Sequence, residues 1–490
     1  MQGDGEEEGV VEGARIRKHQ PNTRAPRSYR SADQRMPTRH LPHRLKTLFL
    51  LLPLSLLAGA IAAEPEITRF RLENGLTLVV VEDHASPTFG LSVVYGVGFR
   101  LEPKGRTGFA HLFEHMMFEG TPSAPKGTFD RVVEGGGGVL NGSTRYDYTN
   151  YISTAPVSAL EPVLWLEADR MRHLDFSEEN LQNQKDVVKE EIRVNVKNRP
   201  YGLFFWTDLA ALAFDRWENA HDGYGSFGDL DRATVEEVKQ FHDTYYVPNN
   251  AVIAVVGDVD PKQVRTWVEK YFGTIPPGKV PPRPDVSETP NTAERFLRQT
   301  DAHATVPALA VGWKMPPPHS PDYFPLAVTA SLLLDGEASL LHQELVKQEQ
   351  TLLEISGGLN WPLGDALTNG GPSLLVAFGL YKPGKPARYS VGVMQRVIDE
   401  LARKGPDPRR LEAVKTKMKA DFYKTLARSI RRADYLAVTQ LLWGDAAMVE
   451  RYGERIDAVT ADDVKRVAAR YLTPENRSWI DRQVAKGKGS

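Results

Sequence analysis

The sequence predicts an α+β fold of two homologous domains, each a sheet with helices covering one face. Three observations support this prediction: strand-like and helix-like patterns are intermixed, two distant segments share one spacing of signals, and a Pro-rich polar stretch separates them. The composition is that of a globular chain, since 41% of the 490 residues are hydrophobic and 25% are charged. A chain of this length forms two or three domains with sizeable cores.

Charge and cysteine content narrow the possible functions. The formal net charge is −2, from 61 basic and 63 acidic side chains, so no long-range field attracts nucleic acid, and we expect no nucleic-acid partner. The chain has no cysteine, which excludes disulfides, iron–sulfur clusters, thiolate metal sites and cysteine nucleophiles. Any metal must therefore be held by His, Asp or Glu.

The N-terminal region has the pattern of a secretory signal peptide. Basic residues precede an apolar run at 48–63, which ends in small residues around Ala62. We expect translation from Met36, a signal peptide at 36–62 and cleavage near Ala62, with 1–35 untranslated or disordered. The run contains Pro53 and is short for a bilayer span, so a retained membrane anchor is the alternative. Together with the lack of cysteine, this predicts a periplasmic or secreted protein.

An internal repeat divides the mature chain. Thr234-Val-Glu-Glu237 reads as a helix capping box, and Thr460-Ala-Asp-Asp463 reads as a variant of it. Each is followed by the same spaced signals, and every pair differs by 226 residues: Val238 and Val464, Phe241 and Val467, Tyr245 and Tyr471, Pro248 and Pro474, Asn250 and Asn476. We interpret this as a duplication.

Residues 275–294 are rich in Pro and polar residues and have no apolar period, so they are predicted to link the two domains. The first domain then spans 63–274 and the second spans 295–490.

The first half is predicted to begin with a hairpin. Alternating apolar residues flank the turn pair Asn74-Gly75, and a further strand is expected at 89–97. Apolar periodicity predicts the remaining elements of this half, which are helices at 108–118, 156–173, 178–197 and 234–246, and a short strand at 251–256.

The helix at 108–118 carries the chemistry. Its sequence GFAHLFEHMMF is apolar except at His111, Glu114 and His115. At 3.6 residues per turn the two histidines lie about 40° apart, and Glu114 lies about 60° to the other side of His111. Two neutral imidazoles at this spacing grip a zinc ion, and the carboxylate beside them can accept a proton from water. The competing interpretation, two hydrogen-bonded core histidines, is less favoured because of the intervening Glu114.

The motif His111-Leu-Phe-Glu114-His115 is an inverted zinc-binding motif. With GFRLEPKGRTGFA before it and MMFEGT after it, it resembles the pitrilysin/insulinase family of zinc metallopeptidases, in the branch of bacterial periplasmic peptidases and mitochondrial processing peptidase. The resemblance covers the mature chain. It implies two homologous α+β domains, which agrees with the repeat.

The resemblance also implies a third zinc ligand, a Glu on a helix about 76 residues beyond the second histidine, which places it at Glu191. One Zn²⁺ per chain would then bind to His111, His115 and Glu191, with Glu114 as the general base. Glu190 points about 100° away on the helix. Many relatives carry a carboxylate seven residues before the ligand, where this chain has Gln184, whose amide can still orient a neighbour.

Residues 135–151 form a second notable segment, glycines followed by a polar strand pattern. A phosphate loop is excluded, because no Lys-Ser or Lys-Thr follows the glycines. A plain turn and strand is one interpretation. The resemblance implies instead an edge strand to which a peptide substrate adds, with Asn141 hydrogen-bonding its backbone.

The second half lacks the zinc motif, because a shift of 226 places Glu337 and Leu341 opposite the two histidines. In active relatives this domain contributes an Arg and a Tyr seven residues apart, and the Tyr stabilises the oxyanion. The matching positions here are Val346 and Leu353, which cannot donate a hydrogen bond. The resemblance thus predicts a second homologous subunit that supplies the pair.

We therefore predict a zinc metalloendopeptidase subunit that hydrolyses peptides or unfolded polypeptides in a chamber formed with a partner. The alternative is a non-catalytic assembly or core subunit of the same fold. The intact set of His111, Glu114, His115 and Glu191 argues against that alternative.

Overall fold

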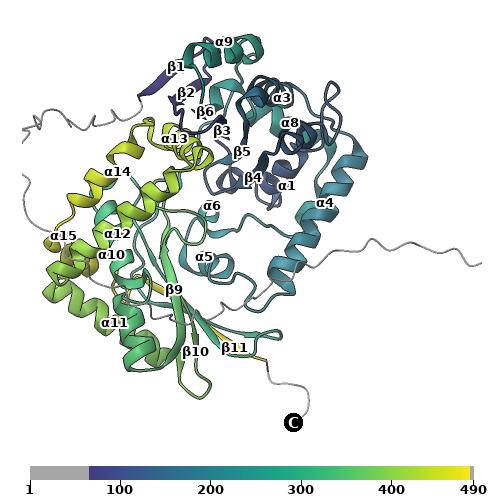
Figure 1. The fold of residues 1–490 in the computed structure, drawn as a ribbon. Helices are drawn as coiled ribbons and strands as arrows, with labels where there is room; N and C mark the ends of the chain where they lie inside the picture. Colours follow the sequence, from purple (N-terminus) through teal and green to yellow (C-terminus); the bar gives the residue numbers. More distant parts are fainter. Residues whose placement is uncertain (1–65, 486–490) are drawn as a thin grey trace, which may run out of the picture. The chain divides into compact units, whose positions relative to one another are not determined.

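The computed structural model describes residues 66–485, which form two sheets surrounded by helices (Figure 1). The signal peptide predicted at 36–62 and the extension at 1–35 lie outside these residues. None of the helices described is long and apolar enough to cross a membrane. The strands are β1 Ile67–Arg71, β2 Thr77–Glu82, β3 Thr88–Tyr95, β4 Val139–Thr144, β5 Thr149–Pro156, β6 Ala251–Gly257, β7 Arg295–Asp301, β8 Ala308–Lys314, β9 Leu352–Leu359, β10 Leu374–Tyr381 and β11 Arg477–Val484.

The helices lie mostly between the strands of each half. Those before the linker are α1 Phe109–Met116, α2 Thr128–Val133, α3 Leu160–Arg172, α4 Glu178–Ile192, α5 Thr207–Ala213, α6 Trp217–Ala220, α7 Phe227–Arg232, α8 Val235–Tyr245 and α9 Pro261–Phe272. Those after it are α10 Tyr323–Leu334, α11 Ala387–Lys404, α12 Pro408–Leu426, α13 Ser429–Trp443, α14 Met448–Asp457 and α15 Ala461–Tyr471.

The two sheets have the same topology, which confirms the predicted pair of homologous α+β domains. The first has the strand order β1-β2-β6-β3-β5-β4 and the second has β7-β11-β8-β10-β9. When β1 is left out, the two orders match strand by strand, so that β2, β6, β3, β5 and β4 correspond to β7, β11, β8, β10 and β9. The pairs β2–β6 and β7–β11 are parallel, and every other pair is antiparallel.

The repeated sequence signals form repeated local structures. Thr234 and Thr460 each close a capping box at the start of α8 and α15. After each helix an asparagine side chain donates to the carbonyl of a tyrosine, Asn250 to Tyr245 at 2.9 Å and Asn476 to Tyr471 at 2.7 Å. The shared spacing therefore reflects one helix-to-strand connection used twice.

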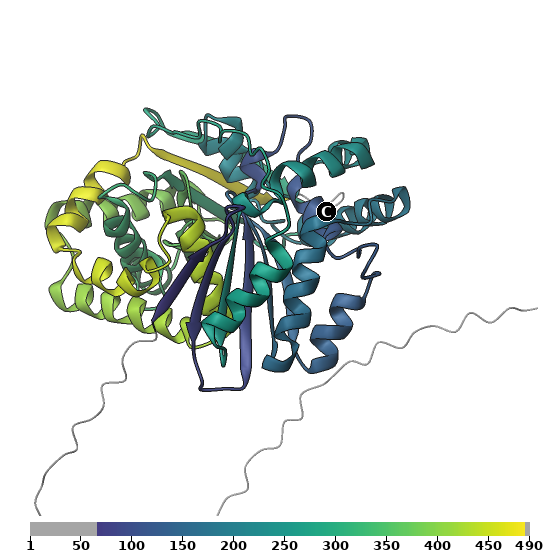
Figure 2. The ribbon, with the colours of Figure 1, turned by 90° about the horizontal axis from the view of Figure 1, so that it is seen from above.

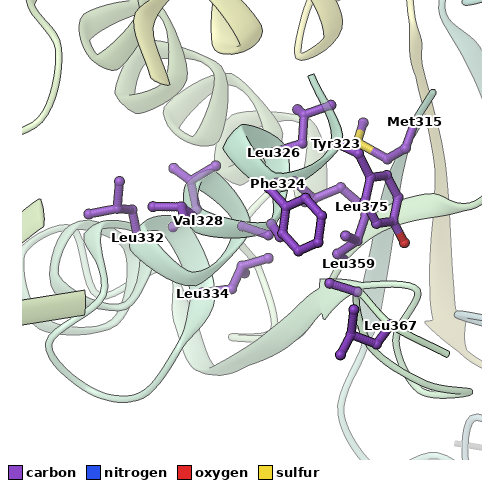
Figure 3. Packing of buried hydrophobic residues seen from close by; sticks show 14 of the residues in the cluster. Met315, Tyr323, Phe324, Leu326, Val328, Leu332, Leu334, Leu359, Leu367 and Leu375 are labelled. Carbon is purple, nitrogen blue, oxygen red and sulfur yellow. The ribbon is translucent and has the colours of Figure 1, made fainter. Parts of the chain in front are cut away.

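The shift of 226 does not extend to the zinc helix. Ala251 and Arg477 differ by 226, yet their strand partners Tyr95 and Trp313 differ by only 218. The helix that follows β8, and so corresponds to α1, is α10, and the placement of Glu337 and Leu341 opposite the histidines is wrong. The physical reason is a difference in connection length between the halves. Helix α10 carries no His or Glu and is buried almost throughout, in the core of the second half (Figure 3).

Helices cover both faces of the first sheet, not one face as the sequence suggested. Helices α1, α3, α8 and α9 pack on one face, and α13 from the second half packs against β3 and β6 on the other (Figure 2). In return α5, from the first half, packs against β8 and β11 of the second sheet. Because both faces are covered, every residue of β6 is buried.

A buried carboxylate joins α13 to the first sheet. Asp434 Oδ1 accepts hydrogen bonds from Ser92 Oγ at 2.9 Å and from Asn150 Nδ2 at 2.6 Å. Burial raises the pKa of Asp434, although both hydrogen bonds oppose that rise. A carboxyl whose pKa is raised on folding stabilises the fold at low pH, and this stability is lost as pH rises through the folded pKa.

Asp434→Asn is therefore expected to leave stability at neutral pH unchanged or higher, since an amide oxygen still accepts both hydrogen bonds without a buried charge. Asp434→Leu leaves Ser92 and Asn150 without this acceptor and is expected to cost about 1–3 kcal/mol. Melting temperatures measured from pH 4 to 8 check this. Equal destabilisation by both substitutions, at every pH, would contradict it.

Candidate metal centre

Helix α1 places its apolar residues in the core and its polar residues at a cavity. Phe109, Ala110, Leu112, Phe113 and Met116 are buried, whereas His111, Glu114 and His115 are partly exposed. The periodicity that predicted one polar face is therefore realised in the structure.

The start of α1 is held by a buried carboxylate. Glu102 accepts hydrogen bonds from the backbone N–H groups of Gly108 at 3.0 Å and Ala110 at 2.8 Å, which otherwise lack a partner within the helix. His221 Nε2 lies 3.2 Å from the same carboxylate. Gly108 has φ +81°, and a Cβ there would meet the Tyr224 carbonyl oxygen at 2.4 Å. Glycine thus lets the loop before α1 pack against residues 223–225.

Three side chains converge beside α1. His111 Nε2 and His115 Nε2 lie 3.3 Å apart, and Glu191 Oε2 lies 3.5 Å from the first and 3.7 Å from the second. Ligands placed about 2.0–2.1 Å from a tetrahedral zinc are separated by about 3.3–3.4 Å, so the separations of 3.3, 3.5 and 3.7 Å in this triangle are close to those of a zinc site. Within residues 66–485, this is the only group of three or more His, Asp or Glu whose ligand atoms converge in this way.

Helix α4 supplies the third member of the triangle. Seven residues complete nearly two turns, so Gln184 and Glu191 share the face that packs against α1. Glu190 instead points away from the site and pairs with Arg193 at 3.0 Å. The structure thus places Glu191, and not Glu190, beside the histidines.

The charge states of the triangle suit a cation. Burial, with a contribution from the charge of His115, lowers the pKa of His111 to about 4, so this imidazole is neutral at pH 7. The contact with His115 lowers the pKa of Glu191, which keeps it ionised. Burial lowers the pKa of His115, but its contact with Glu191 outweighs this and raises the pKa overall. A metal ion at this site would therefore compete with protons for His115 Nε2.

Glu114 stands next to the triangle without belonging to it. Thr144 Oγ1 donates to Glu114 Oε2 at 2.6 Å. On the same strand, a Cβ at Gly142 would meet Glu114 Oε1 at 2.9 Å, so the missing side chain makes room for the carboxylate. Burial raises the pKa of Glu114, against the effect of the Thr144 hydrogen bond. A carboxyl with a raised pKa is suited to accept and return a proton.

The triangle opens into a cavity of about 220 Å³. Sequence reasoning assigned no role to several polar residues of its lining, among them Thr144, Arg145 and Tyr224. Arg145 directly follows β4, and its side chain donates to the Thr144 carbonyl at 3.1 Å. The Tyr224 ring lies edge-on to His111, with 5.7 Å between centroids. Nothing in the sequence marks Tyr224, because a loop brings it to the site.

The other residues singled out from the sequence lie outside the cavity. Gln184 lies behind the metal triangle, with Oε1 3.2 Å from His115 Nδ1. Asn141 is exposed on β4, a free edge of the first sheet, and does not line the cavity. Val346 packs against the core of the second half, and Leu353 is exposed on β9; neither lines the cavity.

Comparison with known proteins gives matches along most of the chain. Residues 77–204 match the family model described as insulinase (peptidase family M16), and residues 232–418 match the one described as peptidase M16 inactive domain. The second description fits a half that lacks the zinc motif.

Individual relatives align over most of their own length. The chain is 28% identical to zinc protease PqqE of Helicobacter pylori, over 83% of this chain and 90% of that protein. It is 23% identical to the mitochondrial-processing peptidase subunit beta of Lentinula edodes, over 82% and 86%. A solved structure of a protease from Helicobacter pylori has a TM-score of 0.78 at 26% identity and covers 86% of this chain and 99% of that one.

Proposed function

The chain belongs to the insulinase family of M16 peptidases, and we propose that it is a zinc-dependent metalloendopeptidase subunit. The observation that carries this proposal is the triangle of His111, His115 and Glu191 at zinc-ligand separations, with Glu114 beside it. A non-catalytic core subunit has no need for a proton acceptor at this position.

Each residue has a separate role in the proposed reaction. His111, His115 and Glu191 would hold one Zn²⁺ per chain. When bound there, the ion supplies a Lewis acid for the scissile carbonyl and for the attacking water. Glu114 accepts the proton of that water and returns it to the leaving amine, while Thr144 holds the carboxylate in place.

The proposed substrate is a peptide or an unfolded polypeptide. Strand β4 has a free edge, and its residues Gly142, Ser143 and Thr144 line the cavity. An extended peptide that adds to this edge through its backbone passes the cavity, and Asn141 is placed to hydrogen-bond it. Recognition through main chain tolerates varied side chains.

We further propose a homologous partner subunit and a periplasmic or secreted location. The partner is needed because Val346 and Leu353 supply no donor to the cavity. One relative is itself named as a subunit, the beta subunit of a processing peptidase. The location rests on the signal peptide pattern at 36–62.

Three substitutions separate base from ligand. Glu114→Gln is expected to keep zinc and to lose at least roughly 10²-fold in peptide hydrolysis, because the proton acceptor is gone. Glu191→Gln is expected to weaken zinc binding itself, and Glu190→Gln is the matched control that changes neither. Metal analysis and hydrolysis of a quenched fluorescent peptide, assayed with the partner present, measure both effects. Zinc loss in Glu190→Gln but not in Glu191→Gln would show that the ligand is Glu190.

A further inference from the structure

A chain of hydrogen bonds runs from the metal triangle to the surface. His115 Nδ1 lies 3.2 Å from Gln184 Oε1, and Gln184 Nε2 donates to Glu119 Oε1 at 2.6 Å. Lys126 Nζ contacts both oxygens of Glu119, at 2.7 and 2.8 Å. Four side chains thus lie in series behind the site.

The inner part of this chain is shielded from water. Gln184 is 7% exposed and Glu119 is 4% exposed, whereas Lys126 reaches solvent. Glu119 lies just after α1, and Gln184 lies on α4. The contact therefore joins the helix that carries the two histidines to the helix that carries Glu191. Because water has little access to Gln184 and Glu119, their polar atoms need hydrogen-bond partners within the protein.

The donors and acceptors allow only one orientation of the Gln184 amide between Glu119 and His115. A carboxylate accepts hydrogen bonds, so Glu119 requires the NH₂ group of Gln184 to face it. The amide oxygen of Gln184 then faces His115 and accepts from Nδ1–H. An imidazole with its proton on Nδ1 has a free lone pair on Nε2, the atom that faces His111 and Glu191.

We propose that Glu119 is a positioning residue of the metal centre: through the Gln184 amide, it fixes the His115 tautomer that binds metal. This inference rests on the proposed zinc site. It also gives a role to Gln184, whose amide links Glu119 to His115.

The critical variant is Glu119→Gln in the mature chain. An amide at position 119 can both donate and accept, so Gln184 is free to turn its NH₂ group toward His115 and favour the tautomer that cannot bind metal. The zinc dissociation constant, measured by competition with a chelator, is expected to rise about 10- to 100-fold. Glu134→Gln, which changes an exposed carboxylate, is the matched control and is expected to bind zinc like the parent chain.

The double variant Glu119→Gln/Gln184→Glu tests the mechanism. Its carboxylate at position 184 accepts from His115 directly, and its amide at position 119 donates to that carboxylate, so the polarity is restored. Zinc affinity is expected to return to within a few-fold of the parent chain. A role of Glu119 in folding alone would predict no such rescue.

The ¹⁵N shifts of His115 in metal-free protein provide a second readout, since they distinguish the two tautomers. We expect Nδ1–H in the parent chain and in the double variant, and a mixture in Glu119→Gln. Unchanged zinc affinity in Glu119→Gln, or a double variant no better than the single one, would overturn the inference. A parent chain that binds no zinc would overturn the metal centre itself, which is a separate result.

Discussion

His111→Ala and His115→Ala are each expected to empty the metal site and abolish peptide hydrolysis. The parent chain should hold about one zinc. Either substitution would leave two of the three proposed ligands, and no other His, Asp or Glu of residues 66–485 joins them in a converging group. Metal analysis of purified protein and peptide hydrolysis in the presence of the partner measure the two consequences together.

His84→Ala is the matched control for this pair. His84 is exposed and its Nδ1 lies 2.6 Å from Asp258 Oδ1, so it is a histidine with a carboxylate neighbour but without a second imidazole. It is expected to retain full zinc and full activity. Full zinc occupancy in either His111→Ala or His115→Ala would disprove the assignment of the metal centre.

The site could be predicted from sequence to the extent that it lies on one helix. The spacing of His111, Glu114 and His115 is a local property of α1, and helical geometry alone brings these residues to one face. Glu191 belongs to another helix, so its selection depended on a family resemblance. Tyr224 reaches the cavity through a loop whose path depends on tertiary contacts, such as the close approach of Gly108 to the Tyr224 carbonyl.

The fold was predictable where a sequence motif occurs in both halves. It was less predictable where a helix of one half packs on the sheet of the other half. The capping boxes at Thr234 and Thr460 indicated the duplication because each is a local motif. The packing of α5 and α13 on each other's sheets is a long-range arrangement. One indication was available, because the strand at 251–256 is apolar at every position, which is typical of a strand buried on both faces. The shift from 226 to 218 residues was not predictable, since connection lengths leave no periodic signal.

The largest remaining expectation concerns the partner. This chain alone is expected to hydrolyse peptides slowly or not at all, even with zinc bound, because Val346 and Leu353, which the resemblance matches to an Arg and a Tyr of active relatives, supply no donor for the oxyanion. Loss of such a donor typically costs about 10²- to 10³-fold in rate. Mixing with a homologous subunit that carries Arg and Tyr seven residues apart is expected to restore at least that factor.

The assay measures the rate at which a quenched fluorescent peptide is hydrolysed by this chain alone, by the partner alone and by the mixture of the two. Two controls locate the chemistry. Glu114→Gln in this chain should silence the mixture if Glu114 is the base, as proposed, and Tyr→Phe in the partner should remove most of the gain. Equal specific activity with and without the partner would refute complementation. Arg145 and Tyr224 would then be the donors to change next, because both line the cavity of about 220 Å³ together with His111, Glu114 and Glu191.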